Sequence, residues 1–164
     1  MFRKSYQSKV KLLSDFILFK NDHKSQVKLI YSILTALAVA ELNYIMFDLP
    51  LALLMTITLV VHEIGHYIYA KASTAQPSYP LFIPMPFFLI GITHILNIPN
   101  KYLSIISLAG IFLSTLYLSF VFLFNLLIPI YNPIVLIMSI IISIVFNLFG
   151  KDGKTYRKAK QNLV

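Results

Sequence analysis

Four apolar runs, each about as long as a membrane-spanning helix, constrain the fold of this chain more than any other feature. A spanning helix needs about 20 predominantly apolar residues. The runs cover about residues 27–47, 49–70, 102–128 and 134–149. With 58% hydrophobic and 12% charged residues, the 164-residue chain has more apolar side chains than one soluble core can bury. We therefore expect an all-α polytopic membrane protein with four transmembrane helices that face the lipid bilayer.

A proline-rich stretch separates the second and third runs. Its prolines are Pro77, Pro80, Pro84, Pro86 and Pro99. This proline density excludes a continuous helix, yet residues 80–98 remain strongly apolar. Non-helical backbone is tolerated at membrane depth where it packs against protein or lines a cavity. We expect a membrane-embedded re-entrant loop over about residues 77–100.

The 14 basic residues indicate which side of the membrane each connection occupies. They lie in or beside a basic amphipathic segment at 1–26, in the loop between the second and third spans, and in a basic tail at 151–164. The connections around Asp48 and Tyr131 have none. Because Lys and Arg concentrate in cytoplasmic connections, we expect an integral protein of the cell membrane with both termini and the proline-rich loop in the cytoplasm. Basic residues beside apolar runs also favour anionic lipid, and not nucleic acid, as the partner of the net charge of +8.

The second run contains the pentapeptide His62-Glu63-Ile64-Gly65-His66. On a helix, His62 and His66 project from one face and can bind a single metal ion. Glu63 can then reach a water in an open coordination position, which is the HExxH arrangement of zinc peptidases with the glutamate as general base. A charge at the centre of a membrane helix costs about 2.5–3.5 kcal/mol. Function is therefore a better explanation of this cluster than chance.

The third metal ligand must be another histidine or an acid, because the chain has no cysteine. The second and fourth spans run in the same direction, toward the cytoplasm. Asp152 follows the fourth span and so lies on the same side of the membrane as His62 and His66. Among the six acids, Asp152 is the best placed third ligand.

The chain resembles the site-2 protease family of intramembrane zinc metalloproteases over about residues 50–155. The resemblance rests on three stretches, which are VHEIGHY at 61–67, YPLFIPMPF at 79–87 and NLFGKDG at 147–153. It implies that Zn²⁺ is held by His62, His66 and Asp152, and that Glu63 is the catalytic base. It also implies that the substrate is a membrane-spanning protein or precursor peptide, cut near the cytoplasmic face.

Two further residues are candidates for contacts with the substrate or the oxyanion. The resemblance implies that Asn147 contacts the substrate carbonyl, although in this chain only five positions separate it from Asp152 and family members usually have a longer, proline-containing stretch. His94, in the apolar loop, could donate to the developing oxyanion, act as an alternative ligand or simply bond to backbone. The same loop could offer an extended edge on which an unwound substrate pairs as a strand.

Two other functions remain open from the sequence. The first is a catalytically silent zinc- or peptide-binding protein of the same fold, with a regulatory or immunity role; the short stretch before Asp152 favours it, whereas the intact Glu63 favours an enzyme. The second is a small transporter with Glu41, His62 and Glu63 as a proton path, which would require acids spread through the depth of the bilayer.

Overall fold

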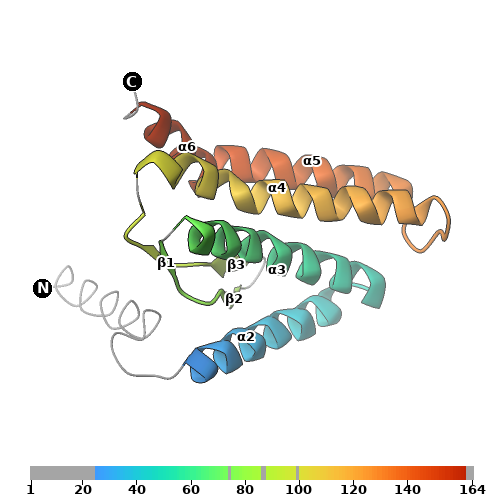
Figure 1. Ribbon diagram of the computed structural model, residues 1–164. Helices are drawn as coiled ribbons and strands as arrows, with labels where there is room; N and C mark the ends of the chain where they lie inside the picture. The colour runs from blue at the N-terminus through green and yellow to red at the C-terminus, as the bar shows by residue number, and fades with distance from the viewer. Residues whose placement is uncertain (1–24, 74, 86–87, 99, 162–164) are drawn as a thin grey trace, which may run out of the picture.

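The structure is a computed structural model that describes residues 25–73, 75–85, 88–98 and 100–161 (Figure 1). The expected amphipathic segment at 1–26 therefore lies almost wholly outside the described residues. The elements in chain order are α2 (Ser25–Met46), α3 (Leu49–Ala72), β1 (Gln76–Pro77), β2 (Leu81–Met85), β3 (Phe88–Ile92), β4 (Ile95–Leu96), α4 (Asn100–Asn125), α5 (Pro133–Phe149) and α6 (Lys151–Gln161).

Three of these helices are long and apolar enough to cross a membrane. They contain the candidate spans Val27–Met46, Leu49–Ala72 and Tyr102–Asn125. Helix α5 and the start of α6 form a bent pair, at 45°, that would supply a fourth. Large apolar side chains stay exposed along the helices, with Ile45 at 74%, Phe120 at 66% and Ile134 at 69% of full exposure. A mostly helical chain with such a surface is typical of a helical membrane protein.

The two short turns between helices are organised by single polar side chains. Asp48 is the N-cap of α3 and accepts a hydrogen bond from the Leu51 backbone N–H at 3.0 Å, and Pro50 occupies the first turn, where its missing N–H leaves no bond unmade. After α4, the Asn125 amide oxygen accepts from the backbone N–H groups of Ile130 and Tyr131, at 2.9 and 2.7 Å. These contacts satisfy backbone donors that a tight turn would otherwise leave open.

The helices lie side by side, with α3 between α2 and α4, and α5 beyond α4 (Figure 1). Leu54, Leu118 and Leu136, one each from α3, α4 and α5, form a buried apolar cluster. A buried hydrogen bond of 2.8 Å from the Asn43 amide to the Thr56 hydroxyl joins α2 to α3. The strands and α6 gather at one end of the molecule, whereas both short turns lie at the other end (Figure 1).

The segment expected as a re-entrant loop contains strands. β2 and β3 pair antiparallel, from Leu81 opposite Ile92 to Met85 opposite Phe88, and β1 pairs with β4. Prolines exclude a helix here, while the apolar and β-branched residues between them favour extended backbone. The outer edge of β2 is covered by α2, because the Phe82 N–H donates to the Thr35 hydroxyl at 3.3 Å. The expected basic tail, in turn, is helical as far as Gln161.

Candidate metal centre

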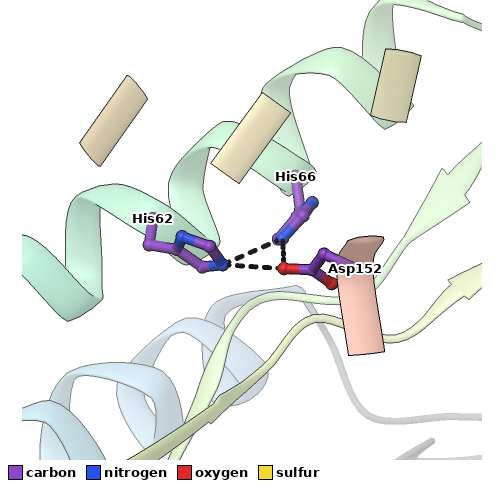
Figure 2. Close-up of side chains that lie close together, drawn as sticks. All are labelled: His62, His66 and Asp152. Carbon is purple, nitrogen blue, oxygen red and sulfur yellow. Dashed lines mark hydrogen bonds and ion pairs between the residues drawn. The ribbon is translucent and has the colours of Figure 1, made fainter. Parts of the chain in front are cut away.

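The structure brings His62, His66 and Asp152 together at one point (Figure 2). Nε2 of His62 lies 3.1 Å from Oδ2 of Asp152, and Nε2 of His66 lies 3.2 Å from the same oxygen. The two Nε2 atoms are 3.2 Å apart. Both histidines are buried, and Asp152 is partly buried. Residues that are 90 positions apart in the chain thus supply one compact set of donor atoms.

The three donor atoms form a triangle whose size suits zinc. In a tetrahedral site with bonds of about 2.0 Å, neighbouring ligand atoms are separated by about 3.3 Å. The observed sides of 3.1, 3.2 and 3.2 Å are close to that value. The triangle is therefore of a size that could form one face of a zinc tetrahedron. Two imidazoles and a carboxylate are also a donor set that zinc accepts in catalytic sites.

The contact with Ile106 determines which nitrogen of His66 faces the other two residues. Nδ1 of His66 lies 2.8 Å from the backbone carbonyl of Ile106, which can only accept a hydrogen bond, so Nδ1 carries a proton. Nε2 is then the atom directed at Oδ2 of Asp152. It can donate to Asp152 when the ring is protonated, or offer a lone pair to a metal ion when the ring is neutral.

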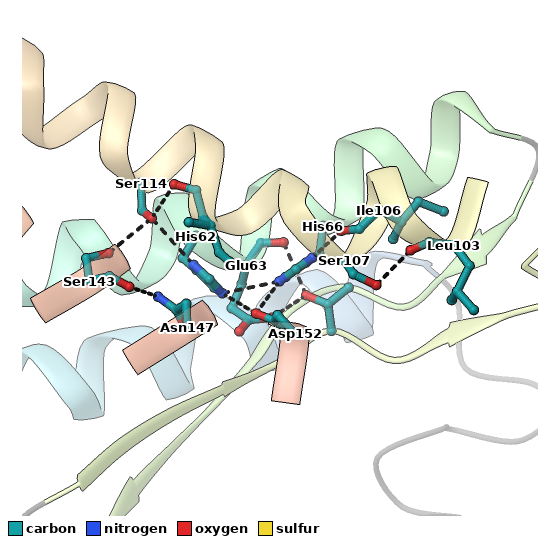
Figure 3. A network of polar contacts seen from close by, with 12 residues as sticks. His62, Glu63, His66, Leu103, Ile106, Ser107, Ser114, Ser143, Asn147 and Asp152 are labelled. Atoms are coloured by element: carbon teal, nitrogen blue, oxygen red, sulfur yellow. Dashed lines mark hydrogen bonds and ion pairs between the residues drawn. The ribbon is translucent and has the colours of Figure 1, made fainter. Parts of the chain in front are cut away.

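His62 is oriented by hydroxyl groups in the same way (Figure 3). The Ser114 hydroxyl lies 3.5 Å from Nδ1 of His62 and 3.2 Å from the Ile111 carbonyl. Ser143 of α5 lies 3.4 Å from the same oxygen. If the hydroxyl donates to Ile111, its oxygen can accept from Nδ1 of His62, which leaves Nε2 as the nitrogen able to bind metal. Partners of this kind set the tautomer and orientation of metal-binding histidines.

Helix α4 approaches the site so closely that only glycine fits. A Cβ on Gly110 would lie 2.5 Å from Nε2 of His66 and 2.8 Å from Nε2 of His62. On the facing helix, a Cβ on Gly65 would lie 2.6 Å from the Ala109 carbonyl oxygen. Gly110 of α4 therefore lies directly against the imidazole nitrogens of His62 and His66.

Asp152 reaches the site because the chain bends sharply between α5 and α6. Gly153 is buried, and any side chain there would collide with the Leu148 carbonyl. The Arg157 guanidinium donates to the same carbonyl at 3.0 Å, which satisfies the end of α5. Burial raises the pKa of the Asp152 carboxyl, but the hydrogen bonds with His62 and His66 lower it more, so its pKa lies below the usual range. Asp152 is thus ionised at neutral pH, as a metal ligand must be.

Glu63 is buried beside the metal-binding histidines and is held by the strand segment. The Thr93 hydroxyl lies 2.7 Å from Oε2 of Glu63 and 3.2 Å from the Glu63 backbone carbonyl. Gly91 of β3 lies against the Glu63 side chain so closely that a Cβ would overlap its Cγ. The sequence offered no signal for Thr93, because a single threonine in an apolar loop has no distinctive pattern.

The structure does not bring Asn147 or His94 into this set of donor atoms. The Asn147 amide donates to the Ser143 carbonyl of its own helix at 2.7 Å (Figure 3). The His94 carbonyl accepts from the Ser78 backbone N–H at 2.7 Å, and the His94 backbone N–H donates to the Ser78 hydroxyl at 3.1 Å. Nδ1 of His94 is buried without a hydrogen-bond partner among the described residues. Their roles in binding the substrate stay predictions.

Comparison with protein-family models, with curated proteins and with solved structures finds no match for this chain. The functional argument therefore depends on the geometry of the site. That geometry comprises three convergent donors and a buried carboxylate from the residue after His62. Such a combination can bind a metal ion, polarise a carbonyl and transfer a proton at one place.

Proposed function

We propose that this protein is an intramembrane zinc metalloprotease of the site-2 protease type. The observation that carries the proposal is the triangle of Nε2 and Oδ2 atoms from His62, His66 and Asp152, with Glu63 buried beside it. A pure zinc-binding protein has no need of a buried glutamate held by its own hydroxyl partner. The substrate we propose is a membrane-spanning protein or precursor peptide.

We also propose that α5 is the fourth span and that the strand segment is embedded in the membrane. Helix α5 has 17 residues, the lower limit for a spanning helix, and α6 continues from it after the bend. The connections at the end with the strands and α6 are the ones that carry basic residues. We therefore assign that end to the cytoplasm, which sets the metal centre toward the cytoplasmic side.

The chain's own residues account for the steps of peptide hydrolysis. Bound zinc would supply a Lewis acid for the scissile carbonyl and lower the pKa of water at the open position. Glu63 accepts the proton of that water and returns it to the leaving amine. His62 and His66, each oriented through Nδ1, and Asp152 hold the metal charge in place. The peptide bond breaks as the water oxygen bonds to its carbonyl carbon.

The open edge of β3 is the site at which we place the substrate. The Phe82 N–H points away from β3, toward Thr35, so Phe82 and its partner Gly91 form a pair without mutual backbone hydrogen bonds. Such pairs alternate along an antiparallel ladder, and the next one is Pro84 with Leu89. The backbone groups of Gly91 and Leu89 are therefore directed away from β2. Pro84, which has no N–H, occupies the matching outward position in β2. An unwound substrate can therefore add as a strand along Leu89 and Gly91, next to Glu63.

The decisive experiment compares purified wild type with Glu63→Gln. Bound zinc and cleavage of candidate membrane-spanning peptides are measured for both. We expect both proteins to hold one zinc per chain and only wild type to cleave, because the amide cannot accept the water's proton. Glu41→Gln is the matched control, since Glu41 is an exposed residue of α2. It should match wild type in both measurements.

The other outcomes are equally informative. Wild type that binds zinc and cleaves none of the peptides supports the catalytically silent alternative. Wild type without zinc contradicts the metal centre itself. Cleavage by Glu63→Gln at the rate of wild type would exclude Glu63 as the base and leave the reaction unexplained.

A further inference from the structure

The hydroxyl of Thr93 is aimed at the one carboxylate that the proposed reaction requires. Thr93 is the first residue after β3 and lies 30 positions from Glu63 in the chain. Its Oγ1 is 2.7 Å from Oε2 of Glu63, a distance typical of a hydrogen bond between a hydroxyl and a carboxylate oxygen. A hydroxyl has a single proton, so the shorter contact with Oε2 is the one it makes, ahead of the 3.2 Å contact with the Glu63 carbonyl.

The same strand restrains the Glu63 side chain from a second direction. Gly91 lies two residues before Thr93, and its missing Cβ leaves the space that the Cγ and carboxylate of Glu63 occupy. The side chain is therefore held between the backbone of Gly91 and the hydroxyl of Thr93. Gly91 belongs to the strand on whose edge we place the substrate, and Thr93 directly follows that strand.

We propose that Thr93 is a positioning residue for the general base, and that it couples substrate docking on β3 to the alignment of Glu63. The inference rests on the proposed protease function. Thr93 donates to Oε2 and leaves Oε1 to accept the proton of the attacking water. Oε2 remains an acceptor after that transfer, so the Thr93 bond persists through both protonation states of Glu63. A substrate strand that orders β3 orders Thr93 with it.

The test compares Thr93→Val, which removes the hydroxyl at nearly constant shape, with Thr93→Ser, which retains it. We expect Thr93→Val to lower kcat about 10- to 100-fold, the effect of losing a hydrogen bond to a charged group. KM and bound zinc should stay within twofold of wild type. Thr93→Ser should restore most of kcat. In a Glu63→Gln background, Thr93→Val should cause no further loss.

A second measurement does not depend on turnover. A peptide hydroxamate binds zinc and also hydrogen-bonds the catalytic glutamate, so its Kd for the zinc-loaded protein reports the alignment of Glu63. We expect Thr93→Val to weaken this binding about tenfold. Thr115→Val is the matched control, because the Thr115 hydroxyl is buried in α4 without a hydrogen-bond partner among the described residues. It should leave kcat and hydroxamate affinity unchanged.

Three results would overturn the role of Thr93. They are a Thr93→Val protein with wild-type kcat and hydroxamate affinity, a Thr93→Ser protein as impaired as Thr93→Val, and a loss of zinc that accompanies the loss of activity. Each would leave the proposed protease intact, provided that wild type cleaves and Glu63→Gln does not. A wild type that binds zinc and never cleaves overturns the proposed function, and the role of Thr93 with it.

Discussion

His66 can offer only one ring nitrogen to a metal, because the carbonyl of Ile106 already holds the other at 2.8 Å. His62 is turned by Ser114 in a similar way. The side chains that orient the ligands thus come from α4, a helix that supplies no ligand itself. At the scale of single residues, the metal centre depends as much on these partners, and on the space left by Gly110, as on the donor atoms.

Gly110 leaves no room for a side chain beside the histidines. Gly110→Ala places a methyl group 2.5 Å from Nε2 of His66, so the histidines must move apart. We expect at least a tenfold loss of zinc affinity, measured by competition with a chelator, although alanine favours a helix by about 0.5–1 kcal/mol over glycine. Phe112→Ala, on the exposed side of the same helix, is the control and should bind zinc like wild type. Unchanged zinc affinity in Gly110→Ala would contradict the position of α4.

At the scale of elements, β2 and β3 are not equivalent. β2 has its outer edge covered by Thr35 of α2, and Pro84 removes a further donor from it. In β3, Gly91 lies against the Glu63 side chain. An edge strand with free backbone groups can pair with an extended peptide. We therefore propose that the substrate docks on the edge of β3 that faces away from β2.

Leu89→Pro tests this edge directly. The substitution removes an outward N–H and should leave the β2–β3 pair intact, because Pro84 already occupies the equivalent outward position in β2. We expect cleavage to fall about 3- to 10-fold, the value of one backbone hydrogen bond, with bound zinc unchanged. Leu89→Ala keeps the N–H and serves as the control for the side chain. If both variants cleave equally well, the substrate does not pair at Leu89.

At the scale of the whole molecule, the two ends differ in charge and in chemistry. The strands, α6 and the start of α2 lie at one end of the molecule, and the connections at that end carry the basic residues (Figure 1). The turns around Asp48 and Tyr131, which carry none, lie at the other end. His62 is nine residues before Lys71, or about 14 Å along the helix axis at 1.5 Å per residue. In the proposed orientation, water and substrate must reach this depth from the cytoplasm.

Cysteine labelling can determine the orientation, because the chain has no native cysteine to interfere. Gln76→Cys and Asn132→Cys place single thiols at exposed positions at opposite ends of the molecule. We expect a membrane-impermeant maleimide to label only Asn132→Cys in intact cells and both variants after solubilisation in detergent. Labelling of Gln76→Cys in intact cells would reverse the proposed topology.

Much of the helical architecture could be predicted from local sequence. The second predicted run, 49–70, and helix α3, Leu49–Ala72, begin at the same residue, because an apolar run and the Asp48-Leu49-Pro50 start signal are both local. The spacing of His62 and His66 also specifies a shared helix face without knowledge of other elements. Asp152 could be chosen as third ligand by the side of the membrane on which it lies, and the structure places its carboxylate against both histidines.

Only the tertiary structure decided how the other polar residues contribute. Thr93 meets Glu63 across 30 positions and Ser114 meets His62 across 52, and neither pairing leaves a periodic pattern in the sequence. An extended edge was expected in the proline-rich loop, but its internal strand pairs were not, because a proline-rich apolar loop and a strand pair look alike until a partner strand is placed beside them. The sequence by itself determined the apolar helices and the shared helix face of His62 and His66, since both depend on neighbours within a few turns. The partners that surround these histidines depend on packing between distant segments, which only the folded chain specifies.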